Sequence, residues 1–209
     1  MVREEVHIAW ARDRQLAGPM PKLMPRWQRL PTLRRVVQRA STVDEVYLAM
    51  WIIDRLPHPE FMPYQEAASL IAYKVHGTTS CADDRKMTVY ARRHKLVSDV
   101  GQLQACELHA LRCIDWKMPS VCIIGHMRSI IRVAGGDKKA EKHIGNGLMR
   151  VLLHCKAPML PETAIAVATF CMAQRSADQI IYAVGADIQV SLAKISALVA
   201  CVGAPMVTA

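Results

Sequence analysis

The feature that most constrains the fold is a segment that is apolar on nearly every side of a helix. Residues 67–75 read AASLIAYKV, follow Pro63, and carry a single charge at Lys74. A helix that is apolar all round cannot lie on a protein surface, because neighbouring elements must cover each of its sides. We therefore expect this segment to be the central helix of a bundle, with the lysine one turn from its end.

Composition and capping signals predict helices on both sides of this segment. Hydrophobic residues make up 52% of the 209 residues and aromatic residues only 5%. A low aromatic content of this kind favours packed helices over sheets. Ser41 and Thr42 are N-cap residues in front of VDEVYLAMWIIDRL, which predicts a further helix.

The stretch RWQRLPTLRRVVQRA predicts an amphipathic helix before that one. We expect Pro31 to kink this helix or to mark its true start. Its predicted apolar stripe consists of Trp27, Leu30, Leu33, Val36 and Val37.

The second half of the chain repeats the rhythm of the first. Pro161 precedes an alanine-rich apolar run as Pro63 does, and residues 187–202 echo residues 99–114. Internal similarity of this kind indicates two copies of one helical unit. We therefore predict an all-α protein of two five-helix units. The predicted boundaries are 1–24 for an N-terminal segment, 25–118 for the first unit and 119–209 for the second.

Charge, cysteines and the first residues bear on the cellular setting. The formal net charge is +9, spread along the chain, which suits a solvated surface, an acidic partner or nucleic acid. Seven cysteines without a CxxC pair favour a reducing compartment. The start, MVREEVHIAWARDRQ, does not resemble a signal peptide, and no apolar run is long enough to span a bilayer. We expect an intracellular protein of the nucleus and cytoplasm that makes no membrane contact.

One carboxylate is out of place in the pattern. In LQACELHALRCIDW, Glu107 falls in the middle of an apolar helix face. An unpaired buried charge is expensive, so Glu107 either lies near the rim of that face or meets a cation. The other members of the face are Leu103, Ala110, Leu111 and Ile114.

Three motifs in the first half together resemble the cyclin family. VYLAMWIIDRL resembles the second-helix signature of the cyclin box, SLIAYKV its buried third helix, and CELHALRCIDWKMPS its fifth helix with the approach to a second box. In the second half, LMRVLLH and LPETAIAVATF are similar to the second cyclin fold. The resemblance spans roughly residues 25 to 203 and implies two tandem cyclin boxes.

The resemblance implies a regulatory, non-catalytic subunit that binds and activates a cyclin-dependent protein kinase as a heterodimer. It implies that Lys74 and Glu107 hold the loop before the kinase's regulatory helix. Independently of the family, an ammonium donates to backbone carbonyls and a carboxylate accepts from backbone N–H groups, which suits gripping a partner. The alternative is an ordinary intramolecular ion pair that contributes little. ATP and magnesium would belong to the kinase, so no cofactor is expected here.

The resemblance also assigns a structural role to Asp54 in WIIDRL. In cyclins this aspartate pairs with an arginine of the first helix of the box. Arg26 fits the expected spacing best, with Arg29 and Arg34 as alternates. A buried pair of this kind supports the fold rather than contacting a substrate.

The sequence departs from typical cyclins at several places, and its first helix lacks a clean Met-Arg-x-Ile-Leu-like pattern. Val75, His76 and Gly77 follow the lysine where cyclins carry acids. Phe61 and Met62 open the third helix where a docking cyclin has an apolar-Gln-Leu turn. We therefore expect kinase activation to survive these departures more readily than docking of Arg-x-Leu substrates.

Nucleic-acid binding is a second class of function. Two tandem cyclin folds also form the core of a general transcription factor of the TFIIB type, and positive charge suits phosphate contacts. The basic cluster consists of Arg92, Arg93, His94 and Lys95, with Arg85 and Lys86 upstream. No zinc ribbon precedes the repeat, and no aromatic residues are interleaved for base stacking.

Intrinsic catalysis is the third class of function, and the motifs do not favour it. The eight histidines lack metal-site spacing such as HExxH; His58, His76 and His94 are expected at loop or solvated positions. RVAGGDKKAEK lacks the GxxxxGK[ST] spacing and reads as a turn between helices. Asp83 and Asp84 are adjacent, so they more readily start a helix than share a proton. We expect a non-enzyme.

Overall fold

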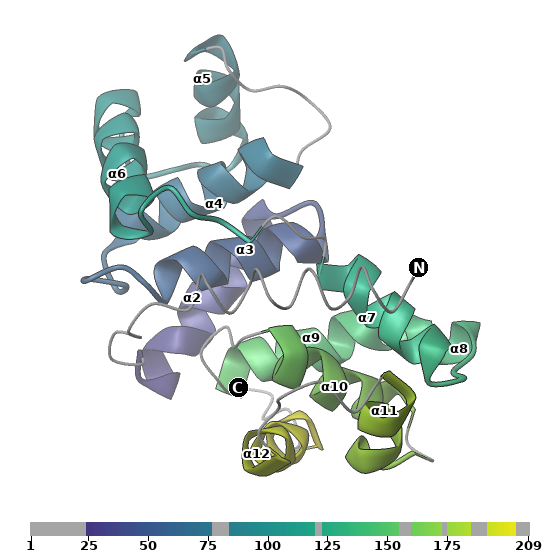
Figure 1. The fold of residues 1–209 in the computed structure, drawn as a ribbon. Helices are drawn as coiled ribbons and strands as arrows, with labels where there is room; N and C mark the ends of the chain where they lie inside the picture. Colours follow the sequence, from purple (N-terminus) through teal and green to yellow (C-terminus); the bar gives the residue numbers. More distant parts are fainter. Residues whose placement is uncertain are drawn as a thin grey trace. The chain divides into compact units, whose positions relative to one another are not determined.

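The computed structural model describes residues 24–76, 84–119, 123–154, 160–172, 175–184 and 192–203. All secondary structure in these ranges is α-helical, and they contain no strand (Figure 1). The predicted all-α class is confirmed. Nearly all of the predicted N-terminal segment 1–24 lies outside the described residues.

The chain divides into two compact units, with the boundary between Pro119 and Ser120. The described helices of the first unit are α2 Arg26–Arg39, α3 Val43–Ile53, α4 Met62–His76, α5 Asp84–Arg93 and α6 Val100–Cys113. Those of the second are α7 Ile123–Val133, α8 Lys138–Lys142, α9 Ile144–His154, α10 Leu160–Cys171, α11 Ala177–Val184 and α12 Leu192–Gly203.

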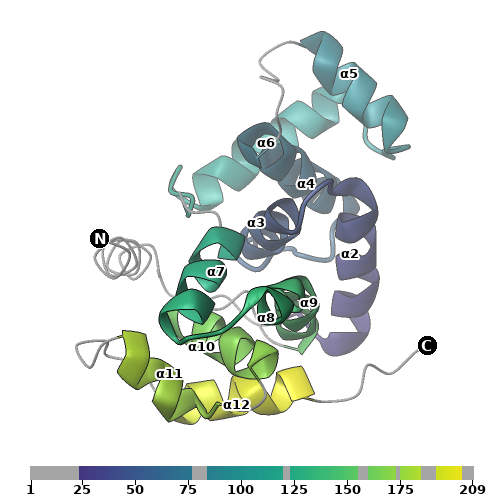
Figure 2. The same ribbon diagram turned by 90° about the vertical axis from the view of Figure 1, so that its right-hand side faces the viewer.

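Helix α4 is at the centre of the first unit, as its all-round apolar sequence predicts. It packs most extensively on α3 and α6 and also touches α2, and Figure 2 shows it between them. Ala67, Leu70 and Ile71 on α4 are at most 2% exposed. Each covered side removes apolar surface from water, so the helix is held by burial rather than by propensity.

Helix α3 owes its start to reciprocal capping. The Thr42 hydroxyl accepts a hydrogen bond from the backbone N–H of Glu45 at 3.2 Å. The Glu45 carboxylate accepts in turn from the N–H of Ser41 at 2.8 Å. This capping-box arrangement satisfies amide groups that the first turn leaves open. The helix then continues through residues 46–53, all of them buried.

The apolar stripe predicted for α2 is only partly correct. Leu33 and Val36 are buried, but Trp27 is 74% exposed and Val37 is 41% exposed. The buried side of α2 instead includes the charged residues Arg29 and Arg39, because each has an acidic partner in the unit. Pro31 lies inside α2 rather than at its start.

Helix α5 joins the first unit through the two residues whose periodicity predicts it. Met87 and Tyr90 are 5% and 3% exposed and pack with Leu70 of α4 and Leu103 of α6. This small cluster also contains Ala67 of α4 and Cys106 of α6. It joins α5 to the direct packing of α4 on α6.

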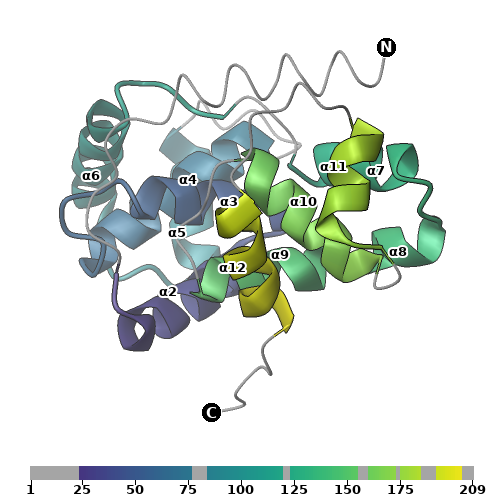
Figure 3. The ribbon, with the colours of Figure 1, turned by 60° about the horizontal axis from the view of Figure 1, so that its bottom comes forward.

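Helix α10 has the corresponding central place in the second unit. It packs on α7, α9, α11 and α12, which surround it in Figure 3. Residues 164–168 of α10 are all fully buried. The alanine-rich run after Pro161 therefore behaves as the one after Pro63 does.

The second unit differs from the predicted five helices in one place. KKAEK is expected in a turn, yet residues 138–142 form the short helix α8 among the described helices. The cause is Asp137, whose carboxylate accepts from the N–H groups of Lys139 and Ala140 and so caps the segment. The preceding glycine pair does turn the chain, with Gly135 in the left-handed region at φ 77°.

None of the described helices combines the length and the apolar character that crossing a membrane requires.

Candidate functional site

The structure brings Lys74 and Glu107 together. Lys74 lies in the last turn of α4 and Glu107 in the middle of α6. The Lys74 Nζ atom donates to both carboxylate oxygens of Glu107, at 2.6 Å and 2.8 Å. The side chains are 29% and 15% exposed, so the pair is partly buried and open to solvent on one side.

The position of Glu107 follows from the phase of α6. Leu103 and Ala110 are fully buried and Cys106 nearly so, whereas Leu108 is 41% exposed. Glu107 lies at the edge of the buried face, between these two sets. The sequence leaves two alternatives open for Glu107, a position at the rim of the face and a cationic partner. Both are correct.

The pair retains capacity for further hydrogen bonds. An ammonium has three N–H donors and an ionised carboxylate has about four lone-pair directions. The two hydrogen bonds of the pair use two of the donors and one direction on each oxygen. A partly exposed ion pair contributes only about 1 kcal/mol to folding or less. Its remaining donor and acceptors are available to a binding partner.

Aliphatic side chains lie near the pair along each helix. Leu111 follows Glu107 by one helical turn and is half-buried. Val75 and Leu108, the neighbours of Lys74 and Glu107 in the sequence, are 45% and 41% exposed. A partner that covered these side chains would exclude water from the pair and strengthen its charge-assisted hydrogen bonds.

The described partner of Asp54 is Arg29. The guanidinium binds the carboxylate through two parallel hydrogen bonds, of which Nη2 to Oδ2 measures 2.9 Å. Arg29 is 1% exposed and Asp54 6%. The sequence spacing favours Arg26, but the structure pairs Asp54 with the alternate, Arg29. Arg29 lies one turn further along α2, on the same face as Leu33 and Val36. The side chain of Arg26 lies outside the described residues.

A second buried charge network was not predicted from the sequence. The Glu66 carboxylate on α4 is fully buried and accepts from Arg39 Nη2 at 3.1 Å. It also accepts from the backbone N–H groups of Val97 at 2.9 Å and Ser98 at 3.0 Å. The sequence feature that could have indicated this network is Glu66 itself, a lone carboxylate immediately before the apolar run of α4.

This network positions the candidate site. Residues 97 and 98 immediately precede Asp99, whose side chain caps α6 by accepting from the N–H of Gln102 at 2.7 Å. Glu66 therefore ties the start of α6 to the same helix that carries Lys74. The relative placement of Lys74 and Glu107 depends on that attachment.

An aromatic corner lies at the other end of α4. Phe61 is 44% exposed and meets Tyr64 edge-on, with ring centroids 5.2 Å apart. Tyr64 stacks in turn on His109 of α6, also at 5.2 Å. The corner opens on a cavity of about 500 Å³.

The basic cluster at the end of α5 does not present one continuous face. Arg92 and Arg93 are exposed, but His94 turns inward and packs on Tyr90 with ring centroids 4.4 Å apart. Burial, then the charges of Arg93 and Arg39, lowers the pKa of His94. His94 therefore lies in the turn after α5, one of the two expected positions, but is half-buried rather than solvated. The side chains of Arg85, Lys86 and Asp84, and all of Asp83, lie outside the described residues.

The groups suited to catalysis or metal binding are dispersed in the described part of the chain. No cluster of three or more His, Cys, Asp or Glu side chains occurs there. Burial raises the pKa of Cys106 and Cys113, and that of Cys171 to about 12, so these thiols stay protonated at neutral pH. His58 is exposed in the loop before α4, and His76 ends α4 half-buried.

Comparison with known proteins adds no family. No family model matches the chain, and no curated protein matches it. The residues and their geometry carry the functional argument.

Proposed function

We propose that the chain is the regulatory, non-catalytic subunit of a cyclin-dependent protein kinase, acting in the nucleus and cytoplasm. In this proposal each of the two helical units is a cyclin box, and the first binds the kinase. The observation that carries the proposal is the Lys74–Glu107 pair, partly exposed among aliphatic side chains.

The architecture of the first unit supports the proposal. Among the five described helices of this unit, α2, α3 and α6 pack on α4, with the VYLAMWII helix α3 making the most extensive contact. The aspartate that ends this motif is held by an arginine of the first helix, as the resemblance implies. The helices with the cyclin-like Lys and Glu motifs lie side by side.

The proposed mechanism is a shift in the kinase's conformational equilibrium. Lys74 donates to a carbonyl and Glu107 accepts an N–H from the loop before the kinase's regulatory helix, while Val75 and Leu108 add apolar area. These bonds form only with the conformer whose catalytic Lys–Glu pair and activation segment are aligned, so binding favours that conformer. The nucleotide and magnesium remain on the kinase.

The first experiment is capture of a panel of cyclin-dependent kinases by the wild-type chain and three variants. Lys74→Ala, Glu107→Ala and the double variant should each lose capture by about tenfold or more, because a desolvated charge is left unpaired. Arg132→Ala with Glu141→Ala removes a comparable surface pair, also at 2.6 Å, and should bind normally. Capture of no kinase, or equal capture by every variant, would show the proposal to be wrong.

DNA binding of the TFIIB type is the second candidate, favoured by the exposed Arg92 and Arg93 and the net charge of +9. Phosphate contacts release counterions, so DNA retention would fall steeply with salt. A chain that retains DNA with a steep salt slope and captures no kinase would decide for this candidate. The inward orientation of His94 removes one of the cations it needs.

A further inference from the structure

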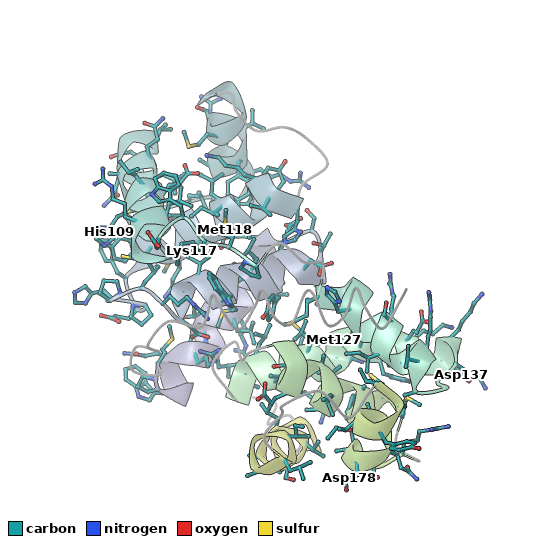
Figure 4. The ribbon with its side chains drawn as sticks, in the orientation of Figure 1. His109, Lys117, Met118, Met127, Asp137 and Asp178 are labelled. Carbon is teal, nitrogen blue, oxygen red and sulfur yellow. The ribbon has the colours of Figure 1, made fainter. Side chains whose placement is uncertain are left out.

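A cavity of about 570 Å³ lies in the second unit and shares no residue with the candidate site of the first. It opens at the corner between α7 and α8 and reaches the end of α10. Figure 4 labels Asp137 at this corner, where side chains with blue nitrogen tips extend from α7 and α8. Its polar lining consists of Gly135, Gly136, Asp137, Lys139, His143 and Arg175.

Side chains that can donate hydrogen bonds form the rim of this cavity, and two of them, a lysine and an arginine, are cations. Lys139, His143 and Arg175 are all exposed, and they converge on it from α8, the turn after α8 and the segment after α10. An ammonium and a guanidinium are charged at neutral pH, and an imidazole can donate from either nitrogen when protonated. These donors match the oxygens of a single compact anion.

The glycine turn determines where the Arg175 guanidinium lies. Gly135 has φ 77°, and a Cβ atom there would stand 3.2 Å from Arg175 Nη2. At Gly136 a Cβ would meet the Ile131 side chain at 2.5 Å and Met172 Sδ at 3.0 Å. The glycine pair therefore lets the backbone approach the end of α10 closely, with the guanidinium lying over the turn at the cavity rim.

One carboxylate lines the cavity, and its charge is already engaged. Asp137 Oδ1 accepts from the N–H groups of Lys139 at 3.0 Å and Ala140 at 2.9 Å. It caps α8 and opposes an incoming anion only in part. The other nearby carboxylate, Glu141, is held by Arg132 at 2.6 Å.

The surrounding surface adds to the positive potential. Arg128 and Arg132 on α7 are 54% and 65% exposed, and Lys138 and Lys142 on α8 are exposed as well. With the two rim cations, six arginine and lysine side chains face two carboxylates here. A surface of one sign around a concavity attracts anionic ligands and raises their association rate.

We propose that this cavity binds the phosphoryl group of a phosphorylated serine or threonine in a partner peptide. Arg175 supplies the planar fork that matches two phosphate oxygens, and Lys139 and His143 supply point contacts. The site is independent of kinase binding by the first unit. It would let this chain recruit proteins that have already been phosphorylated.

The observations favour a peptide over nucleic acid or a membrane. The cations converge on one cavity, whereas a nucleic-acid backbone needs a track of contacts, and Asp137 and Glu141 interrupt such a track. Among the described residues of the second unit, the exposed large apolar side chains are Tyr182 and Leu192, outside α7 and α8, so membrane insertion has no support at the cavity.

The test measures binding of fluorescein-labelled peptides to the full chain by anisotropy. The probes are a phosphoserine peptide library with random flanking residues, the same library unphosphorylated, and single-stranded DNA, with inorganic phosphate as competitor. Vesicles containing phosphatidylserine are tested by cosedimentation. We expect the phosphorylated library to bind at least about tenfold more tightly than the other peptides and to be displaced by phosphate.

Variants distinguish binding in the cavity from binding that depends only on general positive charge. Arg175→Ala should weaken phosphopeptide binding by about tenfold, as loss of a charge-assisted hydrogen bond predicts. Asp137→Asn should strengthen it, because asparagine caps a helix nearly as well and removes the opposing charge. Lys142→Ala removes a charge from α8 outside the cavity and should change little.

Three results would overturn the proposal. One is equal binding of the two peptide libraries, and another is equal loss from Lys142→Ala and Arg175→Ala. The third is cavity-dependent binding of DNA or vesicles in place of phosphopeptide.

Discussion

At the scale of single residues, the structure separates charges that stabilise the fold from charges that remain available. Arg29, Asp54 and Glu66 are buried and fully engaged, so they belong to the fold. Lys74 and Glu107 are engaged with each other but open on one side. That difference in exposure makes the second pair, and not the first, the candidate for binding.

The buried pair predicts a large effect on stability. Arg29→Ala leaves the Asp54 carboxylate buried without its described partner, which lowers the free energy of unfolding by about 3–5 kcal/mol. Urea denaturation followed by circular dichroism measures this. Arg34→Ala on the exposed side of α2 is the control and should change stability by less than about 1 kcal/mol. Equal effects of the two variants would contradict the assignment.

The cysteines predict a pattern of chemical reactivity. Burial raises the pKa of the Cys171 thiol to about 12, so its thiolate fraction at pH 8 is very small and increases about tenfold per pH unit towards pH 11. Alkylation by iodoacetamide, followed by mass spectrometry of Cys171 and the exposed Cys113, measures the rates. Cys171 should react more slowly throughout; rapid labelling at pH 8 would contradict its burial.

At the scale of elements, the position of α6 on α4 determines the geometry of the candidate site. Glu66 holds the backbone of residues 97 and 98, Asp99 then caps α6, and about two turns later α6 presents Glu107. The packing of Met87 and Tyr90 against Leu103 closes the same region. The proposed binding surface therefore depends on buried contacts about two turns away along the same two helices.

Removing the Glu66 charge tests this dependence. Glu66→Gln weakens the contact with Arg39 and leaves that guanidinium without its described carboxylate, so stability should fall by about 3 kcal/mol. Amide hydrogen exchange at residues 97–103 should accelerate more than exchange in α3. Glu60→Gln, in the exposed loop before α4, is the matched control. Unchanged exchange at the start of α6 would contradict the attachment.

The cap of α6 gives a smaller prediction. Asp99→Ala removes the acceptor of the Gln102 N–H and should lower the free energy of unfolding by about 1 kcal/mol. Asp99→Asn keeps an acceptor of similar geometry and should be nearly neutral. The two variants are compared by thermal denaturation, and equal loss from both would show that charge rather than the hydrogen bond matters.

The sequence predicts those elements whose burial is visible in the pattern. The all-round apolar helix α4, the capped helix α3 and the isolated Lys74 and Glu107 stand out because their environment is encoded locally. Trp27 was misplaced, since the hydrophobic pattern treats every tryptophan as buried. Arg29 was only an alternate partner of Asp54, since the pattern does not show which arginine of α2 faces the end of α3, where Asp54 lies.

The same reasoning explains the other differences. KKAEK forms the short helix α8 because Asp137 caps it. The stabilisation from one cap is small, so the sequence pattern alone predicts a turn here. His94 packs inward on the ring of Tyr90. This contact depends on the placement of α5. The phosphate cavity combines a turn, a short helix and the segment after α10, so no single motif signals it.

At the scale of the whole molecule, the two units would divide two tasks. The first carries a charge pair suited to a kinase loop, and the second a cationic cavity suited to a phosphoryl group. A regulatory subunit with both would activate a kinase and recruit previously phosphorylated proteins. The two sites share no residue, so variants of Arg175 should leave kinase capture unchanged.

Charge reversal within the first unit tests the central claim most directly. Lys74→Glu and Glu107→Lys are made singly and together, and affinity for a captured kinase is measured with the unfolding free energy of each protein. We predict that the exchanged pair restores stability, because the two side chains still attract each other, while affinity remains at least about tenfold below that of the wild type. An exchanged pair that restores kinase affinity as well as stability would show that the ion pair only supports the fold.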